Sequence, residues 1–218
     1  MARIGVLTSD FKFYHDVIEL LKMWQLPFVS LNAHDEVPSD VGVLLSSSRD
    51  EFSMPNQFKG DSPLQALRTS LAKLLMKERF DNLVIGIDPG PYPGLAVFAD
   101  GVMMEAYECP VRENLSDEVQ SIVNTYCFNQ LQVKVGNGDA PNRDYIIDRL
   151  KSLNLRITIV DEKNTSFPHK VHDNALSAAR IANVDIRYEL SHQWTNVSRK
   201  NMFEKEFKTL RNQIRTSL

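Results

Sequence analysis

Short apolar runs typical of buried strands alternate with a segment of helical periodicity in the first part of the chain. Strands are expected at residues 2–8, 28–31 and 41–45, and a helix at residues 11–24. Ser9 and Asp10 directly precede the helical pattern and are residue types that cap helices. The pattern predicts a small α/β unit over residues 1–50 with parallel strand pairing. It contains no phosphate loop or catalytic cluster from which a function would follow.

The next segment, residues 51–80, is predicted to connect this unit to a larger one. The polar stretch 46–61 has the composition of a linker. Ser62 and Pro63 are then typical of an N-cap and a first helical position. Leucines at helical spacing extend this predicted helix to about Arg79.

Three apolar runs follow one another closely between residues 82 and 109, separated by turn residues. The first run ends in Asp88, which is followed by Pro-Gly, and the hairpin signal Asp100-Gly101 separates the second run from the third. This predicts an antiparallel meander of three strands. A dinucleotide-binding glycine turn would open a helix, whereas this turn opens another strand, so a Rossmann unit is not favoured.

Strands and helices alternate after the meander. Helices are expected at residues 116–126, at 141–153, from 173 onward and over 203–214, and strands at 131–135 and 155–160. Each later strand would join the first in parallel through a right-handed crossover. We therefore predict an α/β domain over residues 81–218, with one mixed sheet and helices on both faces. Close packing of one helix on the sheet is expected at Ala175, Ala178, Ala179 and Ala182.

Carboxylates gather at one edge of this predicted sheet. Asp88 ends the first strand, Asp161 and Glu162 end the last, and Asp173 begins the following helix. Open α/β sheets build their sites at the carboxyl ends of their strands. Clustered carboxylates repel one another unless cations neutralise them, and oxygen ligands suit Mg²⁺ or Mn²⁺. The pattern predicts a divalent metal site at this edge.

Motifs in this region resemble those of the YqgF/RuvX nucleases and, more distantly, of the RuvC-type Holliday junction resolvases. The Asp-Pro-Gly turn at Asp88 is similar to their first motif. The segment 161–166 (DEKNTS) resembles a family motif of the form DER-x-[ST]-[ST], and Asp173 with the small residues after it resembles the start of the family's next helix. The resemblance covers about residues 83–184 and implies a ribonuclease-H-like fold.

The same resemblance implies a metal-dependent nuclease. Asp88, Glu162 and Asp173 would be the catalytic, metal-binding set, and Asp139 is a further candidate ligand near the place where the resolvases carry a Glu. Two Mg²⁺ or Mn²⁺ ions held there would activate water for phosphodiester hydrolysis. The substrate would be structured RNA or branched DNA.

Other interpretations stay open. Asp173 and Asp139 both precede predicted helices and could act only as N-caps, and Glu162 could be a solvated loop acid. A ribonuclease-H-like module that binds nucleic acid or protein without turnover is the second candidate function, since Asn174 stands where the resolvases have a second Asp. An ATP-dependent phosphotransferase of the sugar-kinase/actin type is the third, although residues 136–139 (GNGD) are short for its second phosphate loop.

The end of the chain is basic in an otherwise slightly acidic protein. The formal net charge is −3, so no global basic field indicates a nucleic-acid partner. Phosphate contacts are nevertheless one interpretation of the tail cations Arg199, Lys200, Arg211 and Arg215. The alternative is a helix that packs through its apolar stripe and leaves a charged face in solvent.

Composition places the protein among ordinary globular proteins. The two cysteines, Cys109 and Cys127, do not form a disulfide framework and are expected to be reduced thiols. No apolar run approaches the roughly 20 residues that a bilayer span needs. We expect a cytoplasmic protein with no membrane contact, and a homodimer is an open alternative.

Overall fold

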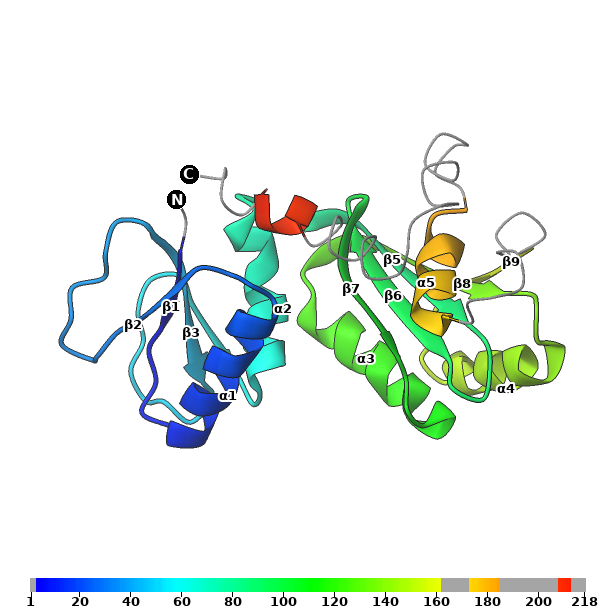
Figure 1. Ribbon diagram of the computed structural model, residues 1–218, viewed down its shortest axis with the longest axis horizontal. Helices are drawn as coiled ribbons and strands as arrows, with labels where there is room; N and C mark the ends of the chain where they lie inside the picture. The colour runs from blue at the N-terminus through cyan, green and yellow to red at the C-terminus, as the bar shows by residue number, and fades with distance from the viewer. Residues whose placement is uncertain (1–2, 162–172, 185–207, 213–218) are drawn as a thin grey trace. The chain divides into compact units, whose positions relative to one another are not determined.

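The computed structural model describes residues 3–161, 173–184 and 208–212, and these fall into two compact units (Figure 1). The N-terminal unit comprises Met1–Arg79, Asn124–Cys127 and Thr209–Leu218, and the second unit comprises Phe80–Val123 and Phe128–Lys208. The coarse fold prediction is confirmed, because the chain is α/β with one parallel and one mixed sheet.

The N-terminal unit is built on a four-stranded parallel sheet. Its elements are β1 (Arg3–Val6), α1 (Phe11–Met23), β2 (Phe28–Ser30), β3 (Val41–Ser47), β4 (Gln57–Gly60) and α2 (Pro63–Leu74). The strand order is β2-β1-β3-β4, and each neighbouring pair is parallel, as predicted for the first three strands. Strand β4 lies in the segment that we expected to be a linker. Its polar sequence, QFKG, has no strand pattern, and pairing with β3 supplies what local propensity does not.

Both helices of this unit begin as the sequence predicts. The Asp10 side chain accepts a hydrogen bond from the Phe13 amide, and Ser62 caps α2 in the same way. Helix α2 ends at Leu74, earlier than predicted, and packs on β3 and β4 and against α1. The core includes these fully or almost fully buried residues: Ile4, Val6, Val17, Leu21, Val43, Leu45, Leu67 and Leu71.

The second unit is built on a five-stranded mixed sheet. Its elements are β5 (Phe80–Asp88), β6 (Gly94–Ala99), β7 (Val102–Glu108), the 3-10 turn η1 (Arg112–Asn114), α3 (Leu115–Thr125), β8 (Phe128–Gly136), α4 (Ala140–Lys151), β9 (Ile157–Val160) and α5 (Asn174–Ala182). The order is β7-β6-β5-β8-β9. The predicted antiparallel meander is confirmed for β5, β6 and β7, and so is the parallel addition of β8 and β9.

Helix α5 covers one face of this sheet at very short range. A Cβ atom added to Gly86 would lie 2.2 Å from the Ala178 carbonyl oxygen, and one added to Gly94 would lie 1.8 Å from the Asn174 carbonyl oxygen. The four predicted alanines are buried where this helix meets the sheet, so their packing role is confirmed. Only glycine fits where the helix backbone comes this close to the strands.

Helix α3 lies on the opposite face. The Tyr107 hydroxyl donates to a Glu118 carboxylate oxygen at 3.0 Å, and Tyr107 shares its face with Leu95 and Ile87, its partners across the sheet. Helices therefore cover both faces, as predicted.

The described part of the C-terminal tail, residues 208–212, is helical and belongs to the N-terminal unit. Leu210 is buried, and the Arg211 guanidinium donates to the Gln25 side-chain oxygen at 2.8 Å. The other tail cations that we singled out, Arg199, Lys200 and Arg215, lie outside the described residues. Across the portion of the chain that is described, no helix is both long and apolar enough to cross a membrane.

Candidate functional site

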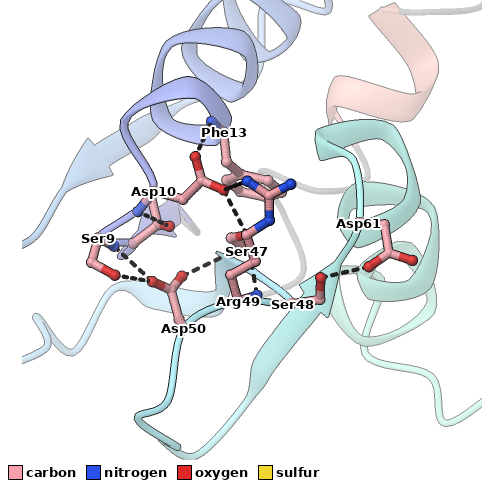
Figure 2. A network of polar contacts seen from close by, with 9 residues as sticks. Ser9, Asp10, Phe13, Ser47, Ser48, Arg49, Asp50 and Asp61 are labelled. Atoms are coloured by element: carbon pink, nitrogen blue, oxygen red, sulfur yellow. Dashed lines mark hydrogen bonds and ion pairs between the residues drawn. The ribbon is translucent and has the colours of Figure 1, made fainter.

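The N-terminal sheet has a topological switch point between β1 and β3. From β1 the chain crosses to β2 on one side, whereas β3 lies on the other side and β4 beyond it. This is the flavodoxin-like strand order, in which ligands bind outside the carboxyl ends of the two strands at the switch point. The loops after β1 and β3 here carry a dense polar network, shown in Figure 2.

Asp50 is the centre of this network. One of its carboxylate oxygens accepts from the Ser9 amide at 2.7 Å and from the Ser9 hydroxyl at 2.6 Å, and the other accepts from the Ser47 amide at 2.9 Å (Figure 2). The residue is only 3% exposed. Asp50 therefore joins the loop after β1 to the end of β3, and a buried carboxylate is stable there because donors surround it.

Asp10 forms a second, more exposed link between the same loops. Besides capping α1, it accepts from the Ser47 hydroxyl at 3.1 Å and lies 3.4 Å from an Arg49 guanidinium nitrogen. The Arg49 side chain is 81% exposed and that of Asp10 is 15% exposed. Phe11, the next residue along the chain, is 83% exposed. A cation thus lies beside the Asp10 carboxylate, and the next residue in the chain exposes an aromatic ring.

Strand β4 closes the network from the other side. The buried Ser46 hydroxyl donates to the Leu7 carbonyl oxygen at 2.6 Å and accepts from the Gln57 side-chain amide at 2.9 Å. The Lys59 ammonium donates to the Asp50 carbonyl oxygen at 2.5 Å. Side chains from β3 and β4 therefore tie the carboxyl ends of three strands together.

The electrostatics of the two carboxylates favour their charged forms. Burial alone would raise the pKa of Asp50, but hydrogen bonds from Ser9, Thr8 and Ser47 outweigh it, and the pKa lies below its usual value. The pKa of Asp10 is lowered chiefly by its hydrogen bond from the Phe13 amide. Both groups are anions near neutral pH, and their oxygens are occupied by donors, so neither is presented as a nucleophile.

In the second unit, the start of α5 meets the carboxyl end of β5. Asp88 pairs with Gly94, and Gly94 lies directly against the backbone of Asn174. The Asn174 side-chain amide donates to the Tyr92 carbonyl oxygen at 2.6 Å and to a Glu108 carboxylate oxygen at 2.8 Å. The first turn of α5 is thereby fixed at the edge of the sheet where Asp88 ends its strand.

The carboxylates that we proposed as metal ligands have the following places. Asp173 is buried and caps α5 by accepting from the Leu176 amide at 3.1 Å, and Asp139 caps α4 by accepting from the Asn142 amide at 3.2 Å. Glu162 lies outside the described residues. Within the described ranges, no group of three or more His, Cys, Asp or Glu residues is arranged to hold a metal ion. The metal role of this set stays a prediction.

Several residues of both sites were not singled out from the sequence. Asp50, Ser46 and Ser47 lie in or beside a segment that we expected to be a linker. Lys134, which is buried on β8, donates to the Ala182 carbonyl oxygen at 3.0 Å and so holds the end of α5. Glu108 holds its start through Asn174. Lys134 stands at a polar position of the alternating run LQVKV, where a lysine is expected to face solvent, so the sequence carries no signal for its burial.

Comparison with known proteins found one similarity, and it lies in the N-terminal unit. A family model for a response regulator receiver-like domain matches residues 3–74, from β1 to the end of α2. A search of curated proteins found no match. The matched region covers the parallel sheet, both of its helices and the polar network at the switch point.

This finding corrects the family assignment that we made from the sequence. The family model that matches describes a response regulator receiver-like domain, and no nuclease family matches the chain. The assignment to YqgF/RuvX-like and RuvC-like nucleases, with hydrolase activity, is therefore wrong. It rested on short motifs around Asp88 and Asp173, and the described cap at Asp173 is a structural role that produces the same pattern.

Proposed function

We propose that this protein is a signalling regulator whose receiver-like N-terminal unit acts by contact with a protein partner. The receiver-like match and the flavodoxin-like strand order support a regulatory module. The main support for the proposal is the state of Asp50: its carboxylate is buried at the switch point and accepts hydrogen bonds from Ser9 and Ser47. Because donors of the chain already occupy the carboxylate oxygens, the site is suited to maintaining the conformation of the two loops and not to group transfer.

The surface near Asp50 exposes residue types that are common in protein–protein interfaces. Phe11 and Arg49 are both highly exposed; Arg49 pairs with the Asp10 carboxylate, and Phe11 follows Asp10 in the chain. Aromatic residues and Arg are enriched in protein interfaces and among the residues that dominate binding energy. A partner that offers an apolar pocket next to an acidic group would complement them.

Two measurements test this function. The purified chain is first incubated with acetyl phosphate and Mg²⁺, and we expect an unchanged intact mass; a phosphoryl adduct on Asp10 or Asp50 would contradict the proposal. Partners are then identified by crosslinking and mass spectrometry in cells of the source organism. A partner captured by the natural chain should be lost with the double variant F11A/R49A and kept with Met23→Ala, which removes an exposed apolar side chain at the far end of α1.

For the second unit, we infer a ribonuclease-H-like arrangement that serves as a binding module. The three-strand meander, the two parallel strands added beside β5 and the helices on both faces support this arrangement. Nucleic acid is the ligand to test first, by fluorescence anisotropy with single-stranded and branched DNA and with structured RNA over a range of salt concentrations. Affinity that falls with salt would support phosphate contacts, and no binding to any of them would leave a protein as the ligand.

A further inference from the structure

Ser9 and Ser47 supply three hydrogen-bond donors to the Asp50 carboxylate at the carboxyl ends of β1 and β3, where Thr8 also bonds to it. The three donors are the amide and hydroxyl of Ser9 and the amide of Ser47, at 2.6 to 2.9 Å from the Asp50 carboxylate oxygens. Two of the three donors are backbone groups, and they come from segments that are 38 positions apart in the chain (47 − 9). The sheet itself therefore sets the spacing of these donors, because β1 and β3 are directly paired.

The geometry of the donors fits an oxyanion. Short hydrogen bonds to a charged acceptor are stronger than neutral ones. Backbone amides that point into one concavity bind anions, and the switch point is the place where this class of sheet binds ligands. The acceptor here is part of the chain: Asp50 lies three residues after the end of β3, and Lys59 of β4 holds its carbonyl oxygen.

We propose that Ser9 and Ser47 form an oxyanion-binding site that Asp50 fills from within the chain. The inference rests on the proposed function and deepens it, because it names what keeps the receiver-like unit in one state. While the Asp50 carboxylate occupies the donors, the loop after β3 is latched to the loop after β1. A free carboxylate of similar size fits the same donors once the Asp50 side chain is removed.

Chemical rescue tests this proposal on the full chain. In Asp50→Ala, the amides of Ser9 and Ser47 lose their acceptor, and we expect their hydrogen exchange to become at least about tenfold faster, since their protection reports local opening. Formate should restore the protection and raise the melting temperature of the variant by about 5 °C. Chloride at the same ionic strength should do neither, and the natural chain should not respond to formate.

Asp61→Ala is the matched control. Asp61 is an exposed carboxylate in the same network that accepts from the Ser48 hydroxyl at 2.5 Å (Figure 2). Its removal leaves the three donors and Asp50 in place, so formate should have no effect. Equal effects of formate and chloride on Asp50→Ala, or unchanged exchange at Ser9 and Ser47 without formate, would overturn the proposal.

A second variant covers the case in which Asp50→Ala does not fold. Asp50→Asn keeps the shape of the side chain and removes its charge, and it turns one acceptor into a donor. Exchange at Ser9 and Ser47 should again become faster, and unchanged exchange there would refute the latch. These measurements need no partner, so a failed rescue is distinct from a failure to find the protein contact through Phe11 and Arg49.

Discussion

The two sheets of this protein fix their carboxyl ends by different means. In the N-terminal unit, side chains reach between loops, and Asp50 accepts from Ser9, which lies 41 residues earlier in the sequence. In the second unit, α5 approaches the strand backbone directly at Gly86 and Gly94, and hydrogen bonds of Asn174 and Lys134 hold its two ends. The carboxylates of Asp139 and Asp173 cap helices and accept from amides only three residues away.

This difference shows that carboxylates near the edge of a sheet can have different structural roles. An N-cap carboxylate accepts a hydrogen bond from an amide three residues later. It satisfies a free amide of the helix terminus and does not connect two strands. A carboxylate that accepts hydrogen bonds from two loops fixes the relative position of two strands, so its loss should lower the stability of the whole unit.

The largest effect is expected from Gly94→Ala. The added Cβ would collide with the backbone of Asn174 at 1.8 Å, and a helix backbone cannot yield as a flexible side chain does. We expect a loss of about 3 kcal/mol in the free energy of unfolding, measured by urea denaturation. Hydrogen exchange should locate the loss in β5, β6 and α5.

Gly90→Ala in the neighbouring turn is the matched control for this variant. The nearest atoms to a Cβ at Gly90 are 4.0 Å away, so ordinary contact is expected and stability should change little. Comparable losses in the two variants would show that the turn, and not the approach of α5, is the sensitive feature.

A smaller but still large effect is expected from Asp50→Asn. The variant removes a buried, charged acceptor from three donors, so the N-terminal unit should lose about 2 kcal/mol. Urea unfolding followed by hydrogen exchange should assign the loss to β1, β3 and the loops that follow them. Asp61→Asn, with its single exposed contact, should be near neutral. The long-range role of Asp50 would be disproved by an equal loss in both variants.

The local cap should matter less than the link between loops. Asp173→Ala removes one acceptor from the Leu176 amide at the start of α5, and about 1 kcal/mol is the usual cost of losing a cap. Hydrogen exchange should become faster in the first turn of α5 alone. A loss greater than that of Asp50→Asn would reverse the comparison and indicate that Asp173 does more than cap its helix.

The smallest effect on stability is expected from Arg49→Ala. Its ion pair with Asp10 is highly exposed, and such pairs contribute little in water. The melting temperature should be unchanged, while binding of the protein partner should weaken. A clear loss of stability would show that Arg49 supports the fold of the unit and would contradict its role in the contact surface.

Local features of the fold could be predicted from the sequence. The caps at Asp10 and Ser62 and the hairpin turn at Asp100-Gly101 depend on residues that are neighbours in the chain. The turn needs positive φ values, and Asp100 has 49° and Gly101 has 80°. The helices and the meander followed from periodicity in the same way.

The candidate site could not be predicted in the same way. Asp50 and Ser9 have no signal that links them, and the short polar strand β4 becomes a strand only through its pairing with β3. Asp139 and Asp173, two of the acidic residues that we singled out, stand next to helix starts, where a cap and a metal ligand look alike in sequence. Only the long-range contacts of the folded chain distinguish the two roles.

Titration of Asp50, followed by carbon NMR of its carboxylate, tests directly whether Ser9 and Ser47 hold this group as an anion. We expect a pKa below the ordinary value of about 3.9, since burial raises it but the hydrogen bonds outweigh burial. Because the folded pKa is lowered, the stabilisation by Asp50 should be complete above about pH 4 and should disappear as the pH falls through the folded pKa. The amide signals of Ser9 and Ser47 should shift with the same midpoint. A pKa at or above the ordinary value, or amide signals that do not shift with the Asp50 carboxylate, would show that Ser9 and Ser47 do not hold it as an anion.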